Sequence, residues 1–260
     1  MELLIYLIIG ILSGLIGGLL GIGGGAIIVP SLVSIFSYLH FPKDTVMHAA
    51  IGTSLATTAV NSFFSAYLHN KNLGITWDFV RKILPGIILG ALLGSFIATL
   101  LSSRWLEILF GFFAIWIALR FFNPKFRKSN IPLSLSWIKI SSLGLIIAIF
   151  SNLVGVGGGV FMIPLLTFCH FSPKKIVGTS ASISCLISVL GTSFFLYQTQ
   201  RADTSGYGYI HLQAFLGITL GSLLSISYGV QLTKTLPYPI ISKIFATLML
   251  ITGIVMFIGR

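Results

Sequence analysis

Two glycine-rich segments hold the residues of this chain best suited to binding a ligand. The first reads Gly21-Ile-Gly-Gly-Gly-Ala-Ile-Ile-Val-Pro30, and the second reads Gly155-Val-Gly-Gly-Gly-Val-Phe-Met-Ile-Pro164. A helix that restarts after consecutive glycines presents unpaired backbone N–H groups and the positive end of its dipole. An anion can approach such a backbone closely, because no Cβ stands in the way. We therefore predict that these glycines bind an anion: Gly21, Gly23, Gly24, Gly25, Gly155, Gly157, Gly158 and Gly159.

Two other interpretations of the glycine segments compete with an anion site. Small residues also let helices pack closely in lipid, and this alternative stays open. A nucleotide-binding loop would need a preceding strand, a following amphipathic helix and an acidic residue about 20 positions on. The flanks here are uniformly apolar, and the acid near that distance, Asp44, lies in a loop. A nucleotide loop is therefore excluded.

A Gly-Thr-Ser block follows each glycine segment and supplies hydroxyl groups inside an apolar stretch. The blocks are Gly52-Thr53-Ser54 and Gly178-Thr179-Ser180, and Thr57, Thr58, Ser182 and Ser184 extend the pattern. Hydroxyls can donate to an oxyanion without placing a charge in the membrane. They can equally bond to the carbonyl four residues earlier in their own helix. We predict that four of them contact the substrate: Thr53, Ser54, Thr179 and Ser180.

The positions of the acidic residues and the lack of catalytic motifs argue against other classes of function. The five acids lie outside the middle of the apolar segments, whereas a carrier of protons or metal cations usually keeps a carboxylate there. No HExxH motif, intramembrane Asp pair or facing Ser-His set is present, so we predict no catalytic residues and no enzyme activity. Cys169 and Cys185 make no metal or CxxC spacing, and no metal or cofactor is predicted.

Composition indicates that these residues lie within a lipid bilayer. The chain is 55% hydrophobic and only 8% charged, with a mean hydropathy of +1.01, whereas soluble domains carry about a quarter charged residues. Apolar runs long enough to cross a bilayer recur throughout. The first starts at Met1-Glu2 without a basic region or cleavage site, so we expect a retained span. The net charge of +11 is scattered between these runs, which excludes nucleic acid as a partner.

The apolar segments predict an all-α polytopic protein of the cell membrane, with 8–10 membrane helices. The segments 3–20 and 24–39 are separated only by the first glycine motif. Together they would form a helix of about 55 Å, too long for a hydrocarbon core of about 30 Å, so the motif must break the helix. The spacings Gly10-xxx-Gly14-xxx-Gly18, Gly86-xxx-Gly90-xxx-Gly94 and Gly217-xxx-Gly221-xxx-Ser225 are typical of helix-packing faces. The remaining predicted segments are 47–69, 79–101, 105–122, 137–154, 158–170, 175–197, 208–231 and 237–258.

The chain is built from two related halves. Both contain, in the same order, the glycine motif, a His-Phe pair, the Gly-Thr-Ser block and a Gly-xxx-Gly pair. We assign residues 1–122 to repeat 1, 123–136 to a cytoplasmic linker and 137–260 to repeat 2. If each glycine-broken pair is a hairpin, the repeats are inverted, and one side of the membrane carries 12 of the 16 basic residues. The positive-inside rule favours this arrangement, with both termini outside the cytoplasm.

The doubled Gly-x-Gly-Gly-Gly-x₄-Pro segments, each followed by Gly-Thr-Ser, resemble the sulfite exporter TauE/SafE family of membrane permeases. The resemblance covers nearly the whole chain. It implies a small sulfur-containing anion, such as sulfite, sulfoacetate or thiosulfate, as the substrate. The matched glycines and hydroxyls are the site residues that it carries over.

Two classes of function therefore stay open. The first is a small-anion permease, and without a carboxylate to carry a proton we expect it to export. The second is an anion channel or another membrane component without alternating access. The expected partners are the anion and the bilayer, and the sequence leaves open whether the chain forms a homo-oligomer.

Overall fold

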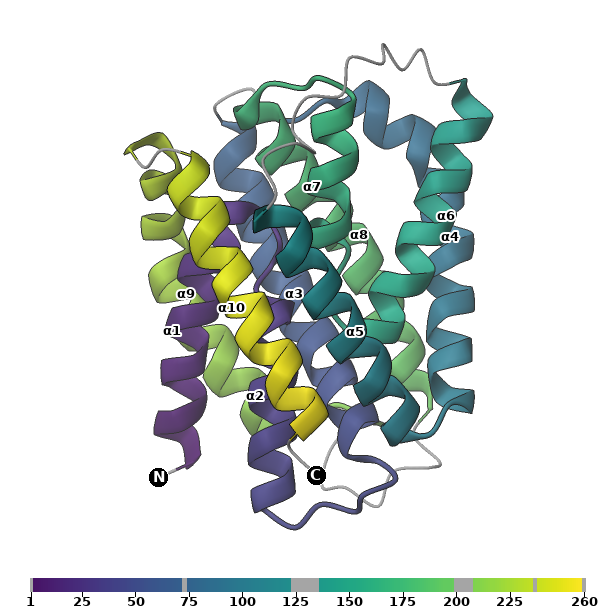
Figure 1. The fold of residues 1–260 in the computed structure, drawn as a ribbon, viewed down its shortest axis with the longest axis vertical. Coiled ribbons are helices and arrows are strands. Elements are labelled where there is room, and N and C mark those ends of the chain that lie inside the picture. The colour runs from purple at the N-terminus through teal and green to yellow at the C-terminus, as the bar shows by residue number, and fades with distance from the viewer. Residues whose placement is uncertain (1, 72–73, 123–135, 199–207, 236–237, 259–260) are drawn as a thin grey trace.

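The computed structural model describes residues 2–71, 74–122, 136–198, 208–235 and 238–258. Within these ranges the chain folds almost entirely into helices, which confirms the predicted all-α class (Figure 1). The first half contains α1 (Glu2–Leu20), α2 (Gly25–Tyr38), α3 (Val46–Asn70), α4 (Trp77–Leu100) and α5 (Ser103–Phe122). The second half contains α6 (Trp137–Val154), α7 (Gly159–Phe168), α8 (Pro173–Tyr197), α9 (Leu212–Thr235) and α10 (Tyr238–Ile258). All but one residue of the predicted linker lie outside the described residues.

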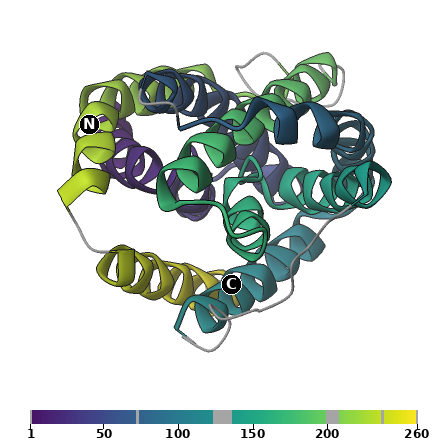
Figure 2. The ribbon, with the colours of Figure 1, turned by 90° about the horizontal axis from the view of Figure 1, so that it is seen from above.

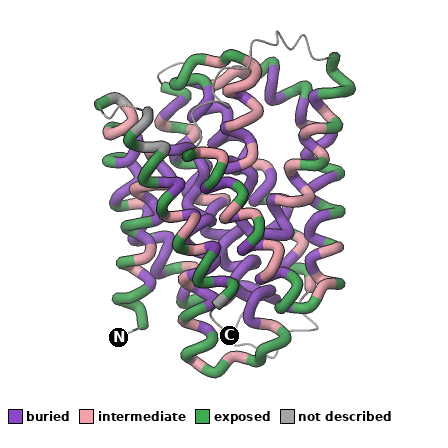
Figure 3. The backbone as a smooth tube through the Cα atoms, viewed as in Figure 1, coloured by how far each residue is buried: buried purple, intermediate pink, exposed green. Residues whose placement is uncertain are grey.

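Six of the described helices are long and apolar enough to cross a membrane: α1, α4, α5, α6, α8 and α9. Exposed residues lie on the outside of the bundle, and buried residues fill its centre (Figure 3). Many of the exposed residues are large and apolar. Helix α3 is long enough to cross but less apolar, because buried hydroxyl, amide and imidazole side chains lie along it. These polar side chains are buried among the neighbouring helices, so they meet protein rather than hydrocarbon.

Both glycine motifs break the helix, as predicted. Helix α1 ends at Leu20 and α2 begins at Gly25, while α6 ends at Val154 and α7 begins at Gly159. Three glycines in each break have positive φ angles, and the last of each set, Gly24 and Gly158, has φ of 87°. Residues with a Cβ rarely adopt this conformation, so the glycines are required for the turn itself.

The helices pair across the two halves in a symmetric pattern. Helix α1 packs along α9, and α6 packs along α4, so the first helix of each half lies against the fourth helix of the other. The third helices, α3 and α8, pack together, as do the fifth helices, α5 and α10. Figure 2 shows α5 and α10 side by side along one flank of the bundle. The N- and C-terminal ends lie at the same end of the molecule (Figure 1).

The predicted glycine ladders form the close contacts between these pairs. Gly86, Gly90 and Gly94 of α4 lie against the backbone of α6, and Gly10, Gly14 and Gly18 of α1 lie against α9. A Cβ at Gly94 would stand 2.6 Å from the carbonyl oxygen of Ile149, a distance that real side chains do not adopt. The ladders are therefore packing surfaces, as the sequence predicted.

One predicted boundary differs clearly from the structure. The sequence placed the ninth segment at 208–231, whereas α9 begins at Leu212. The preceding residues are held by other helices: the Tyr209 amide donates to the Phe195 carbonyl (3.5 Å), and the His211 amide donates to Thr53 Oγ1 (2.9 Å). Apolar run length includes these buried residues and cannot tell them from helix.

Candidate functional site

The two glycine breaks meet each other in the buried centre of the bundle. A Cβ on Gly25 would stand 2.9 Å from the carbonyl oxygen of Gly155 and 2.9 Å from the Cα of Val156. On the other side, a Cβ on Gly159 would stand 2.6 Å from the Cα of Ile22. Each helix start therefore packs against the opposite break. We call this junction, residues 21–25 and 155–159, the glycine crossing.

Two helix N-termini point into the glycine crossing. The first helical hydrogen bonds of α2 run from the Ile27 and Ile28 amides to the Gly24 carbonyl (3.0 and 3.2 Å), and in α7 Phe161 and Met162 donate to Gly158 in the same way (3.1 and 3.0 Å). The amides before them belong to the first turn, which has no acceptor within its own helix. These are the N–H groups of Gly25, Ala26, Gly159 and Val160.

The serines of the Gly-Thr-Ser blocks hold the crossing together. Ser54 of the first half donates to the carbonyl of Gly155 in the second half (2.8 Å). Ser180 of the second half donates to the carbonyl of Gly21 in the first half (3.0 Å). Each serine therefore binds the first glycine of the opposite motif. Both side chains are fully buried, so these bonds are shielded from competing water.

The threonines of the same blocks secure the segments that lead into α4 and α9. Thr53 Oγ1 accepts from the His211 amide (2.9 Å), just before α9. Thr179 Oγ1 accepts from the Thr76 amide (3.0 Å), just before α4. In this way each block ties its own helix to the fourth helix of the other half.

The twelve predicted site residues thus come together around one junction, although their roles differ. The eight glycines form the crossing. The four hydroxyls at Thr53, Ser54, Thr179 and Ser180 each have a protein partner in this conformation. That these hydroxyls contact the substrate stays a prediction. In the structure the two serines hold the glycine loops, and the two threonines hold the segments before α9 and α4.

A stripe of hydroxyls along α3 faces a matching stripe along α8. The members follow a four-residue spacing, which places them on one helix face. Ser62 donates to Ser184 (3.1 Å) across the interface. Ser62 and Ser188 were not predicted from the sequence, although the same four-residue spacing, continued along each helix, includes them. The stripe consists of Ser54, Thr58 and Ser62 on α3 and Ser180, Ser184 and Ser188 on α8.

Two of the hydroxyls that extend the Gly-Thr-Ser pattern point elsewhere. Thr57 donates to the carbonyl of Thr53 (3.0 Å), and Ser182 donates to the carbonyl of Gly178 (3.0 Å). Both bonds run four residues back in the same helix, which is the ordinary alternative for Ser and Thr in membrane helices. Thr57 and Ser182 are therefore not part of the crossing.

Asn61 also stabilises the first glycine break. Its side-chain NH₂ group donates to the Gly23 carbonyl (3.1 Å), and its side-chain oxygen accepts from Ser222. In the other half, Asn152 donates to the Ala91 carbonyl (2.8 Å) and to Ser95 (3.0 Å). Ser95 and Ser222 occupy matching positions, five residues after Gly90 and Gly217. Asn61 therefore connects the first glycine break to α9, and Asn152 connects α6 to α4.

The glycine crossing carries no charged side chain and is rich in hydrogen-bond donors. Among the residues whose burial is described, no Lys or Arg is buried. The buried carboxylate Glu107 lies in α5 with Arg104 3.4 Å away. An anion at the crossing would therefore be held by N–H and O–H dipoles rather than by a counter-charge.

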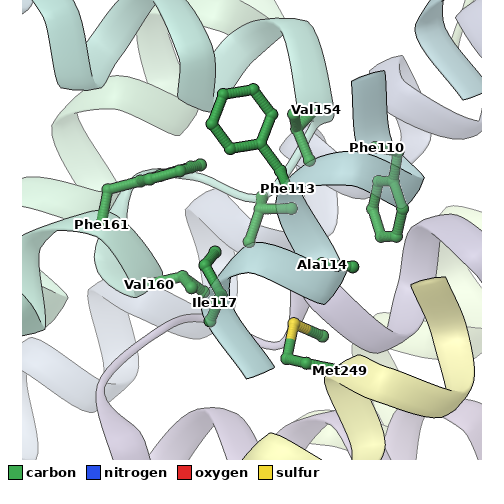
Figure 4. Close-up of a pocket in the computed structure, with 9 residues that line it drawn as sticks. Phe110, Phe113, Ala114, Ile117, Val154, Val160, Phe161 and Met249 are labelled. Atoms are coloured by element: carbon green, nitrogen blue, oxygen red, sulfur yellow. The ribbon is translucent and has the colours of Figure 1, made fainter. Parts of the chain in front are cut away.

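A small apolar cavity lies beside the second glycine break (Figure 4). Its volume is about 10 Å³, close to that of one water-sized sphere. The described residues that line it are all apolar and come from α5, from the α6–α7 region and from α10: Phe110, Phe113, Ala114, Ile117, Val154, Val156, Val160, Phe161 and Met249. Such a lining offers an anion no hydrogen bond, so this cavity is not the candidate site.

Comparison with models of known protein families identifies the family of this chain. The family model described as "Sulfite exporter TauE/SafE" matches residues 6–256, nearly the whole chain. The chain belongs to this family. The resemblance predicted from the doubled glycine and Gly-Thr-Ser motifs is thereby confirmed, and the protein is a membrane protein of a transporter family.

Relatives from distant organisms match most of the length of the TauE/SafE chain. A probable membrane transporter protein of Haemophilus influenzae is 30% identical over 98% of this chain and 98% of its own length. One from Methanocaldococcus jannaschii is 28% identical over 88% of this chain and 86% of its own length. The probable membrane transporter protein YunE of Bacillus subtilis is 30% identical over 74% of this chain and 77% of its own. These names indicate transport and specify no substrate.

Proposed function

We propose that the protein is a permease that exports small anions across the cell membrane, with sulfur-containing oxyanions or organosulfonates as its substrates. One observation carries this proposal: two helix N-termini, one from each half, meet through glycines at the buried centre of a membrane bundle. Helix N-termini bind anions through free amides and a favourable dipole. The family supports sulfur oxyanions as the class to test first.

The packing at the crossing favours a carrier over an open channel. Gly25 and Gly159 each lie in close contact with the opposite break, so the conformation described here is closed at its centre. Passage of an anion then requires the helices around the crossing to move. We infer that the halves are inverted repeats that rock against each other about this site, as in many secondary transporters.

The direction of transport follows from the neutral site. A carrier without a counter-charge moves the net negative charge of its substrate. A potential of about 100 mV, inside negative, favours outward movement of one negative charge by roughly 2.3 kcal/mol. This corresponds to a concentration ratio of about 50-fold at equilibrium. Export therefore needs no coupled ion.

The test is anion efflux from proteoliposomes that contain the purified protein. Vesicles are loaded with sulfite, sulfoacetate, thiosulfate or chloride, and potassium with valinomycin sets the voltage. We expect saturable efflux of the sulfur anions that rises as the interior becomes more negative and is stimulated by external substrate. A channel would give flux without this countertransport stimulation.

The variant Gly25→Leu distinguishes transport through the glycine crossing from nonspecific leakage of the vesicles. Gly25→Leu would place its side chain against Gly155 and Val156, and its vesicles should leak no more than protein-free vesicles. Wild-type flux that is indifferent to voltage but follows a proton gradient would overturn the electrogenic mechanism. Wild-type vesicles that retain all of these anions would overturn the proposed function.

A further inference from the structure

The symmetry of the α3–α8 interface is incomplete at one pair of hydroxyls. Aligning the two Gly-Thr-Ser blocks places Thr58 opposite Ser184 and Ser62 opposite Ser188. Ser62 donates to Ser184 (3.1 Å), so the symmetric counterpart of this bond would join Ser188 to Thr58. Instead, neither of these hydroxyls has a hydrogen-bond partner among the described residues, although both side chains are fully buried.

Thr58 and Ser188 both face the glycine crossing. A Cβ built on Gly157 would stand 2.5 Å from Ser188 Oγ and 2.5 Å from the Thr58 methyl carbon, so the two side chains flank the same glycine. The Thr58 hydroxyl oxygen lies on the other side of its side chain, 3.0 Å from where a Cβ on Gly25 would stand. Gly25 is the first residue of α2, and Gly157 precedes the N-terminal cap of α7. Each hydroxyl therefore lies beside one of the two helix N-termini.

Buried hydroxyls without partners are rare in native proteins, because burial removes the water to which they would bond. Thr57, the neighbour of Thr58, satisfies its hydroxyl with the carbonyl four residues earlier. The Thr58 hydroxyl is not paired in this way and points at the crossing instead. A ligand at the crossing would supply the missing acceptors.

We propose that the Thr58 and Ser188 hydroxyls donate hydrogen bonds to the oxygens of the transported anion, and that together they select oxyanions over halides. This inference rests on the proposed function and adds its binding residues. The two hydroxyls come from opposite halves and add to the first-turn amides of α2 and α7. A sulfonate or sulfite group has several acceptor oxygens and can bond to donors from both halves at once. A single-atom halide has no separate oxygens to distribute among them.

Two substitutions at position 58 separate the hydroxyl from the methyl group. Thr58→Val keeps the shape and removes the donor, whereas Thr58→Ser keeps the donor and removes the methyl group that packs against Gly23 and Gly157. We expect Thr58→Val to raise the KM for sulfite or sulfoacetate efflux by about 10- to 100-fold, the effect of one lost hydrogen bond to a charged group. Thr58→Ser should retain a KM close to that of the wild type. If the residue served only to pack the loops, Thr58→Ser would be the damaging change.

Ser188 and two matched controls complete the experiment. Ser188→Ala should raise the KM by a similar factor, while Thr57→Val and Ser182→Ala remove hydroxyls that bond within their own helices and should leave it unchanged. Because neither hydroxyl has a partner, removing it leaves no other buried group unpaired and removes a desolvation cost. The apparent Tm of the Thr58→Val and Ser188→Ala proteins in detergent should therefore equal or exceed that of the wild type.

The outcomes distinguish this inference from the proposed function. The shift in apparent Tm on addition of sulfite, sulfoacetate or chloride measures binding independently of flux. Wild-type efflux with an unchanged KM in both Thr58→Val and Ser188→Ala would overturn the inference alone. Wild-type protein that neither exports nor is stabilised by any of these anions would overturn both. Equal stabilisation by chloride and by sulfite would overturn the selectivity.

Discussion

At the scale of single residues, the Gly-Thr-Ser block is a junction between the two halves of the molecule. Its serine binds the opposite glycine break, and its threonine binds the segment before the opposite fourth helix, in both halves. Its glycine allows close backbone contact, since Gly178 lies against Gly74 and Gly52 lies against Tyr209. Three adjacent residues thus make three different contacts with the other half.

This role predicts a loss of stability when the serines are truncated. Ser54→Ala would leave the buried Gly155 carbonyl without its donor, which costs about 1–3 kcal/mol. Ser180→Ala should have a similar effect through Gly21. Unfolding of the purified variants in mixed detergent measures this loss. Ser193→Ala is the control, because Ser193 is exposed and bonds only to its own helix. Variants as stable as this control would contradict the junction role.

At the scale of helices, close backbone approach defines the long interfaces. Glycines on α4 contact α6, and glycines on α1 contact α9. Lipid tails are as apolar as Leu side chains, so helices in a bilayer gain little from apolar burial alone. Close packing of small residues supplies the attraction instead.

A larger side chain at this interface should therefore separate the helices. Gly90→Leu would overlap the carbonyl of Leu145 and force α4 away from α6, at a cost of about 1–3 kcal/mol. Thermal unfolding followed by circular dichroism measures the change. Leu89→Ala, at the adjacent lipid-facing position, should have little effect because Leu89 is 57% exposed. An unchanged Tm for Gly90→Leu would show that the pair does not depend on this contact.

Much of the helical architecture could be predicted from the sequence. The apolar runs located the helices. The first break could be located because a single helix over residues 3–39 would be longer than the bilayer core is thick. Which helices pair across the halves could not be predicted, since most exposed helix faces are apolar and the choice of partner depends on shape. The glycine crossing was predicted as a site. The hydrogen bonds of Ser54 and Thr53 to the other half were not predicted, because the presence of a Ser or Thr does not specify the partner of its hydroxyl.

At the scale of the whole molecule, positive charges from both halves gather at one end. The loop after α3 begins with Lys71 and includes Gly74. An ideal Cβ on Gly74 would stand 3.2 Å from the carbonyl oxygen of Lys174, which lies in the first turn of α8. Lys71 and Lys174 therefore belong to the same end of the bundle. The chain termini lie at the opposite end (Figure 1). The positive-inside rule predicts that the lysine-bearing end faces the cytoplasm.

This orientation predicts where a reporter fused after Arg260 is active. Alkaline phosphatase, which needs an oxidising compartment, should be active in this fusion, and a fluorescent protein that folds only in the cytoplasm should be dark. Fusions truncated after Phe122 should give the reverse pattern, since α5 ends at the other face. A fluorescent fusion at Arg260 would contradict both the orientation and the inverted repeats.

The pairing of α1 with α9 also dictates the order in which the protein can mature. At about 5–20 residues per second, a ribosome needs about 10–40 s to proceed from Leu20 to Leu212, so α1 enters the bilayer long before its partner exists. Likewise, the Ser54 hydroxyl and the Asn61 side-chain oxygen have no partners until Gly155 and then Ser222 have been synthesised. Helix α1 therefore remains without its main partner until the second half has been synthesised. A chain interrupted before Ser222 would therefore leave the Asn61 side-chain oxygen of α3 without this donor in lipid, where an unpaired polar group is costly.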